Sequence, residues 1–167
     1  MSDWNARRIL RDLVDGETRR RVLTAFWRHG DAQSKMLAQA YLAKALHFRD
    51  ETIRKMPPEK KADLLASRIG ASDFDQFLEM ALMQYHTHEA KTLMAAFLDQ
   101  WGVPHVDGSI ESDDYTTPDA DKVRASMKEL AGQFEKKDVL LYFDTAGLLM
   151  GDDWRAGMWP VVDENAS

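Results

Sequence analysis

Apolar residues recur along most of this chain at steps of three and four positions, a spacing that places them on one face of an α-helix. Residues 139–143 are the exception, because this run of β-branched and aromatic residues is also compatible with a buried strand. No other run alternates convincingly to pair with it, so we interpret residues 138–150 as a buried helix. The clearest helical stripe comprises Phe74, Phe77, Leu78, Ala81, Leu82 and Tyr85.

Capping and breaking residues divide this pattern into separate helices. Glycines follow several apolar stripes, at the position where a left-handed residue commonly ends a helix. Pro57-Pro58 interrupts the chain, and Thr117-Pro118-Asp119 combines a capping residue, a proline and an acid at a helix start. The pattern predicts an all-α fold. We expect a single domain over residues 1–167, with about seven or eight helices in a bundle or a short stack of helical hairpins.

Three regions are less regular. Residues 73–101 form either one long helix or two helices broken near Thr87, a residue type that can cap a helix. Residues 102–117 contain two glycines, a proline, two serines and four acids, and we predict an irregular acidic loop there. Residues 151–167 contain two tryptophans and a proline, and we predict an irregular C-terminal tail that packs back on the helices.

The composition is that of a globular protein, with 44% apolar and 30% charged residues among 167. Cysteine is absent, which excludes disulfide bonds and thiolate metal sites. The longest purely apolar run is six residues, at 93–98, whereas a helix that spans a bilayer needs about 20. The first residues lack the basic-then-apolar order of a signal peptide. We therefore predict a cytoplasmic protein that does not associate with a membrane.

Charge is distributed unevenly around a net value of −6. Residues 1–61 carry 14 Lys and Arg against 8 Asp and Glu, whereas residues 62–167 carry 8 against 20. A basic segment can bind nucleic acid or an acidic partner, but the two parts can also attract each other, within the fold or between subunits. We favour mutual attraction and predict no nucleic-acid binding. Three consecutive arginines at 19–21 point around their helix, and no aromatic residues alternate with them.

Histidines and carboxylates gather near the middle of the chain. Five of them could bind a divalent metal ion, the one cofactor that the sequence suggests: His86, His88, Glu89, His105 and Asp107. Histidines two positions apart point about 200° apart on a helix, so one ion reaches both only if the helix breaks between them. The i, i+4 histidine pair of zinc proteases is missing. A surface or structural role is therefore the more common alternative for these histidines.

The acidic loop contains a second candidate site. Glu111, Asp113 and Asp114 could contact a protein partner, or coordinate calcium or magnesium together with Asp107. Their spacing does not match the twelve-residue calcium loop, which requires a central glycine and a final glutamate. We interpret the three acids as a partner-binding surface, with a solvated loop as the simpler alternative.

The sequence contains no catalytic motif of the common kinds. It lacks the phosphate-binding loop of nucleotidases, the Gly-x-Ser-x-Gly nucleophile and the dinucleotide-binding fingerprint. The leading prediction is therefore a non-catalytic, adaptor-type protein–protein interaction module, or a homo-oligomer. Its partner would dock on a helix groove or on residues 103–117. The alternative is a small helical metal-binding protein or hydrolase-like enzyme centred on His86, His88, Glu89 and His105.

Overall fold

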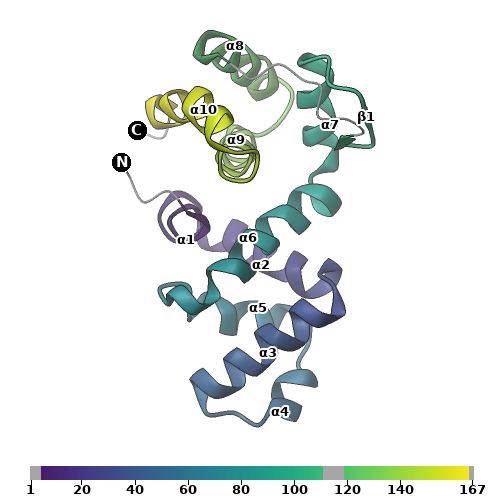
Figure 1. Cartoon of the computed structure of the whole chain (residues 1–167), viewed down its shortest axis with the longest axis vertical. Helices are drawn as coiled ribbons and strands as arrows, with labels where there is room; N and C mark the ends of the chain where they lie inside the picture. The colour runs from purple at the N-terminus through teal and green to yellow at the C-terminus, as the bar shows by residue number, and fades with distance from the viewer. Residues whose placement is uncertain (1–4, 111–118, 166–167) are drawn as a thin grey trace. The chain divides into compact units, whose positions relative to one another are not determined.

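The computed structural model describes residues 5–110 and 119–165, and these are almost entirely helical (Figure 1). The prediction of an all-α fold is confirmed, with ten α-helices in the described residues where the sequence predicts seven or eight. The chain divides into two compact units, the first over Met1–His88 and the second over Glu89–Ser167. The prediction of a single domain over residues 1–167 stays a prediction. None of the described helices is both long and apolar enough to span a bilayer.

The first unit is a set of short helices with well-defined starts. The side chains of Asn5, Asp15 and Asp31 each accept a hydrogen bond from a backbone N–H at the start of a helix. Pro58 begins another helix, at a position where a backbone N–H would have no hydrogen-bond partner within the helix. In chain order the elements are α1 (Ala6–Arg8), the π-helix η1 (Ile9–Leu13), α2 (Gly16–His29), α3 (Ala32–Leu46), α4 (Asp50–Arg54), α5 (Pro58–Ala66), the 3₁₀ turn η2 (Ser72–Phe74), α6 (Asp75–Gln84) and the π-helix η3 (Tyr85–Glu89).

The core of the first unit lies around α2, which packs against α5 and α6, while α3 packs against α4 (Figure 1). Phe26 of α2 and Phe77 of α6 are buried, with their ring centroids 6.0 Å apart. The predicted stripe on residues 74–85 is confirmed, because all six of its apolar residues are buried. Spacing of three and four positions therefore identifies the side of α6 that faces this core.

Residues 73–101 form two helices, which settles the alternative that the sequence leaves open. The helical backbone continues from α6 through the π-turn η3 and breaks at Ala90, whose φ of −125° and ψ of 25° are not helical. α7 (Lys91–Gln100) then begins. The break does not fall at Thr87, whose hydroxyl donates a hydrogen bond to the backbone oxygen of Met83 at 2.8 Å. This bond ties Thr87 to the preceding turn instead of capping a new helix.

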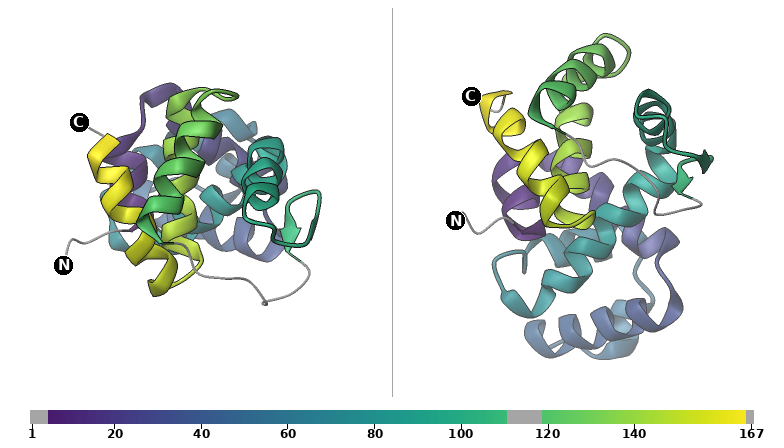
Figure 2. Two further views of the ribbon diagram at one scale, coloured as in Figure 1. Left: turned by 90° about the horizontal axis from the view of Figure 1, so that it is seen from above. Right: turned by 45° about the horizontal axis from the view of Figure 1, so that its top comes forward.

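The described residues of the second unit form four helices and one small hairpin. α8, α9 and α10 pack against one another, and α7 packs against α8 and α9; Figure 2 shows α8, α9 and α10 from two further sides. Residues 138–149 are helical, as predicted for all but the last residue of 138–150, and most of α9 is buried. Apart from α7, the elements are the strands β1 (His105–Val106) and β2 (Ser109–Ile110), then α8 (Ala120–Ala131), α9 (Lys136–Leu149) and α10 (Asp152–Asn165).

The prediction of an irregular tail over residues 151–167 is wrong for its described part, which is the helix α10. Gly151 makes the turn from α9, with a φ of +98° that favours glycine. Two acids, Asp152 and Asp153, occupy the first turn, where negative charge stabilises a helix. Pro160 lies inside the helix, on its exposed side. The buried stripe, at steps of four, three and one, comprises Trp154, Met158, Val161 and Val162.

The prediction of an irregular loop over residues 102–117 is wrong for residues 105–110, which form an antiparallel hairpin. Val106 pairs with Ser109 across a two-residue turn. Asp107 and Gly108 have φ values of 50° and 87°, so both turn residues are left-handed. This is the arrangement that an Asp-Gly pair favours in the tightest hairpins. Residues 111–117 lie outside the described residues.

Candidate functional site

The five predicted metal ligands are divided between the two units. His86 and His88 belong to the first unit, and Glu89, His105 and Asp107 belong to the second. Within either unit, the described residues include no group of three or more His, Asp or Glu side chains that could hold a metal ion. The five-residue metal site stays a prediction.

His105 holds the hairpin against the end of α7. Its Nδ1 accepts a hydrogen bond from the backbone N–H of Gly108 at 3.0 Å. Its Nε2 then carries the proton and lies 2.8 Å from a carboxylate oxygen of Asp99. Both ring nitrogens of His105 therefore form hydrogen bonds within the fold. Asp107 forms part of the hairpin turn, where its backbone is left-handed. These contacts give His105 and Asp107 a structural role in the second unit.

The π-turn places His86 and His88 in different environments. His86 is 3% exposed, and its ring meets that of Tyr85 edge to face at 5.2 Å. Burial lowers the pKa of His86 to about 3, so this imidazole is neutral at neutral pH. His88 is exposed and stacks on the ring of His29 at the end of α2, with centroids 4.4 Å apart and planes 14° apart. The two histidines therefore do not form one side of a common site in this unit.

The predicted partner-binding acids Glu111, Asp113 and Asp114 lie outside the described residues. Partner binding at this loop therefore stays a prediction. Of the predicted acidic surface, the structure describes Asp107, which is exposed at the hairpin turn.

The three consecutive arginines 19–21 form contacts within the first unit. Each binds a different neighbour, so the three charges do not form a common patch. This supports the interpretation that basic residues near the start of the chain are attracted to other parts of the fold. The contacts are Arg19 to the backbone oxygens of Leu10 and Arg11, Arg20 to the Asp63 carboxylate at 2.9 Å, and Arg21 over the Tyr85 ring at 5.5 Å.

An apolar face of α3 remains exposed in the first unit. Ala38, Leu42 and Ala43 point into the core. Met36 is 70% exposed and Leu37 is 44% exposed. The sequence contains a signal for this face, because α3 has more apolar residues than one buried stripe can accommodate. The spacing of these residues does not by itself separate the buried from the exposed ones.

A pocket of about 690 Å³ opens beside the second half of this face. The ring of Tyr41 forms part of it and is held edge to face against Phe74 and Phe77, with centroids 6.1 and 5.8 Å apart. We call this pocket, together with Met36 and Leu37, the α3 groove. The residues that line the pocket are Ala40, Tyr41, Lys44, Ala45, His47, Asp73 and Phe74.

The pocket of the α3 groove is lined by charges of both signs, Lys44 and Asp73. Residues 32–61 carry seven Lys and Arg against three Asp and Glu. Among those acids, Glu51 pairs with Lys55 at 2.7 Å, and Asp50 accepts a hydrogen bond from the neutral amide of Gln39 at 2.9 Å, which leaves its charge in place. Lys44 extends from the pocket rim into solvent.

His47 ends α3 in a left-handed conformation, with φ 55° and ψ 35°, and its side chain lines the pocket. Glycine is the usual residue at such a position, because a Cβ is strained there. We expect His47→Gly to raise the free energy of unfolding by about 0.5–1 kcal/mol in urea titrations. The matched control Lys44→Gly, in regular helix three residues earlier, should lower it by about 1 kcal/mol. A destabilised His47→Gly variant would contradict the strain at this helix end.

The α3 groove is where the described part of the first unit combines exposed apolar side chains with a pocket. Its lining is mostly hydrocarbon, which suits the binding of an apolar side chain. In comparisons with known proteins, the chain matches no protein family, no curated protein and no solved structure.

Proposed function

We propose that this chain is a non-catalytic protein-binding module that docks an amphipathic helix of a partner protein in the α3 groove. One observation carries the proposal: Met36, Leu37 and Tyr41 are exposed on one face of α3, directly beside a pocket. Contiguous exposed apolar surface beside a polar rim is typical of a protein-interaction site. A helix that lies in such a groove inserts apolar residues at i, i+3, i+4 and i+7.

The pocket has an ordered wall, which favours binding. Tyr41 is fixed by aromatic contacts with Phe74 and Phe77, so its ring does not have to be immobilised when a partner arrives. Ordering a side chain at an interface costs roughly 0.5–1.5 kcal/mol, and a preorganised wall reduces that cost. The exposed thioether of Met36 is flexible and polarisable, and it can adapt to a partner's side chain.

The alternative function, a metal-binding or hydrolase-like site, has weaker support. His105 uses both ring nitrogens for the hairpin and Asp99. His86 is buried within the first unit. A ligand must present a free nitrogen lone pair to the metal, and His105 offers none in this arrangement.

The proposal is tested by selection from a displayed library of amphipathic helices. Each member has about four turns, fixed apolar residues at i, i+3, i+4 and i+7, and random residues elsewhere. The full chain is immobilised as bait. We expect it to enrich helices that the variant Met36→Gln/Leu37→Gln binds at least about tenfold more weakly, because two apolar contacts are lost. Affinities of the enriched helices are measured by fluorescence anisotropy.

The control variant is Met83→Gln, which changes a methionine on α6 that is 43% exposed and lies outside the α3 groove. It should bind the selected helices as the unchanged protein does. All variants should keep their thermal unfolding midpoint, since exposed substitutions change stability by only about 0.5 kcal/mol. Failure to enrich any helix, or equal binding by the Met36→Gln/Leu37→Gln variant, would refute the proposal. A dimer in light scattering that this variant dissociates would instead identify a second copy as the occupant.

A further inference from the structure

We infer that Asp107 is a site of spontaneous isoaspartate formation, and that His105 controls the rate by holding the backbone N–H of Gly108. The sequence contains two Asp-Gly pairs, Asp15-Gly16 and Asp107-Gly108. Such pairs are prone to this reaction, because glycine has no Cβ to obstruct its own backbone nitrogen. The two pairs lie in different surroundings, and this difference indicates which of them reacts in the folded protein.

The reaction proceeds in two steps that leave the composition of the chain unchanged. The backbone nitrogen of Gly108 forms a bond with the carboxyl carbon Cγ of Asp107. The protonated carboxyl group loses its hydroxyl, which leaves as water together with the amide proton, and a succinimide ring remains. Water then adds to one ring carbonyl. Addition at Cγ restores aspartate, whereas addition at the main-chain carbonyl carbon breaks the original peptide bond, and the chain then continues through Cγ as isoaspartate.

The folded hairpin keeps the attacking nitrogen away from the carboxyl group. Asp107 is left-handed, with a φ of 50°. A residue in this region has a ψ of about +47°, which points the nitrogen of the next residue roughly opposite its own Cβ. The N–H of Gly108 also donates a hydrogen bond to Nδ1 of His105 at 3.0 Å. Within residues 5–110 and 119–165, the exposed Asp107 carboxylate forms no hydrogen bond or ion pair, so its side chain is ready to react once the backbone is released.

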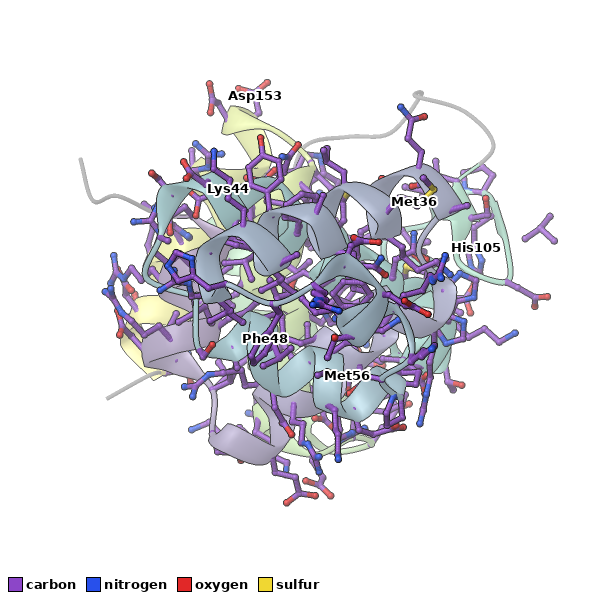
Figure 3. All side chains as sticks on the ribbon, turned by 90° about the horizontal axis from the view of Figure 1, so that it is seen from below. Met36, Lys44, Phe48, Met56, His105 and Asp153 are labelled. Carbon is purple, nitrogen blue, oxygen red and sulfur yellow. The ribbon has the colours of Figure 1, made fainter. Side chains whose placement is uncertain are left out.

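The hairpin that imposes this geometry is small. Each strand has two residues, and a two-stranded hairpin is only marginally stable on its own. Figure 3 shows His105 on this hairpin, where its Nε2 lies 2.8 Å from a carboxylate oxygen of Asp99. Gly108 packs against α7, where Met94 occupies the space that a Cβ would need. Opening the hairpin breaks these local contacts and leaves the helices of the second unit in place.

The other pair is restrained by a larger element. Asp15 is the N-cap of α2, and its carboxylate accepts a hydrogen bond from the backbone N–H of Thr18 at 2.6 Å. Gly16 is the first residue of the helix, and α2 lies at the core of the first unit. Release of Asp15 requires the loss of this cap and of the first turn of α2. Isoaspartate is therefore expected to form faster at Asp107 than at Asp15 while the protein is folded.

The experiment compares the two pairs in one molecule, which is a close match because each follows a valine. The full chain is incubated for several weeks at mildly acidic pH, where part of the carboxyl groups is protonated. Electron-transfer mass spectrometry of its proteolytic peptides then locates and quantifies isoaspartate. Conversion should be several-fold faster at Asp107 than at Asp15 in the folded protein. In concentrated urea the two rates should become similar, because neither pair is then restrained.

Variants test the role of His105. His105→Ala should speed conversion at Asp107 several-fold and leave Asp15 unchanged, and Asp99→Ala, which removes the other end of the contact, should act in the same direction. The control His88→Ala removes an exposed histidine of the first unit and should change neither rate. Near-ultraviolet circular dichroism checks that each variant keeps its packed tryptophans. Equal conversion of the two aspartates in the folded chain would overturn the inference. So would a rate at Asp107 that His105→Ala leaves unchanged or lowers, the latter because the imidazole would then be activating the nitrogen as a base.

Discussion

Lowering the pH below about 6 is expected to destabilise this protein by about 1.4 kcal/mol per pH unit through His86 alone. Burial lowers the pKa of this imidazole from 6.5 to about 3 in the folded protein. Between these values the unfolded chain binds a proton that the folded protein does not bind, so the free energy of unfolding falls as the pH falls. The loss begins near pH 6.5 and ends near pH 3, where the folded protein also takes up the proton.

The variant His86→Phe isolates this contribution, because it keeps an aromatic ring beside Tyr85 and removes the titrating group. Urea titrations at several pH values between about 6 and 4.5 avoid most of the carboxylate titrations. Over that range the slope of unfolding free energy against pH should be smaller in the variant by about 1.4 kcal/mol per pH unit, which corresponds to the uptake of one proton. The control Met83→Phe changes an exposed residue that does not titrate, three positions earlier, and should keep the slope of the unchanged protein. Equal slopes for His86→Phe and the unchanged protein would contradict the burial of a neutral imidazole.

Replacing Phe97 by alanine is expected to cost about 3–5 kcal/mol of stability. This ring is fully buried and lies at the centre of an aromatic cluster in the second unit. Alanine would leave a cavity that rigid rings cannot fill, and the lost contacts add to the lost burial. The neighbouring ring centroids, at 5.0 to 5.9 Å, belong to Trp101, Tyr142, Phe143 and Trp154.

Near-ultraviolet circular dichroism during thermal unfolding measures this effect, because two tryptophans of the cluster report on its packing. Phe97→Leu should lose less, about 1.5 kcal/mol, since it retains most of the apolar volume. Met83→Ala removes an exposed side chain and should stay within about 0.5 kcal/mol. A loss below about 1 kcal/mol for Phe97→Ala would show that the cluster is not a packed core.

Local signals predicted much of the fold correctly. Asp31 and Pro58 begin helices because their effects on backbone hydrogen bonding act over only a few residues. The stripe on α6 identifies its buried side because helix geometry alone brings those positions together. Residues 139–143 are helical because, among the described residues, no strand lies beside them, as the absence of an alternating partner predicted.

The errors arose where two local signals competed. Pro160 lies in the segment that we predicted to be irregular, and a proline inside a helix removes one hydrogen bond; Trp154 and Met158 nevertheless lie four positions apart, on the buried side of α10. Burial of that stripe against α9 outweighs one missing hydrogen bond on the exposed side. The Asp-Gly pair that makes the hairpin was visible in the sequence. Its flanking strands are only two residues long, which leaves no alternation to detect.

The candidate site depends on contacts between distant segments, so sequence spacing could not locate it. An apolar residue on α3 faces either the core or solvent according to which helices cover it, and that is decided by the path of the whole chain. His105 shows the same limit. Its metal-ligand role stays a prediction, and its hydrogen bonds with Asp99 and Gly108 depend on the path of the chain and could not be read from its spacing.

The proline inside α10 has a consequence for how this helix opens. The ring of Pro160 supplies no N–H to the carbonyl of Ala156, four residues earlier, and both residues are exposed. Solvent can reach the backbone at this point without any other bond being broken. The two short helical segments on either side of this point can therefore fray independently. The stability of each depends more on packing against α9 and α8 than on hydrogen bonds along the helix.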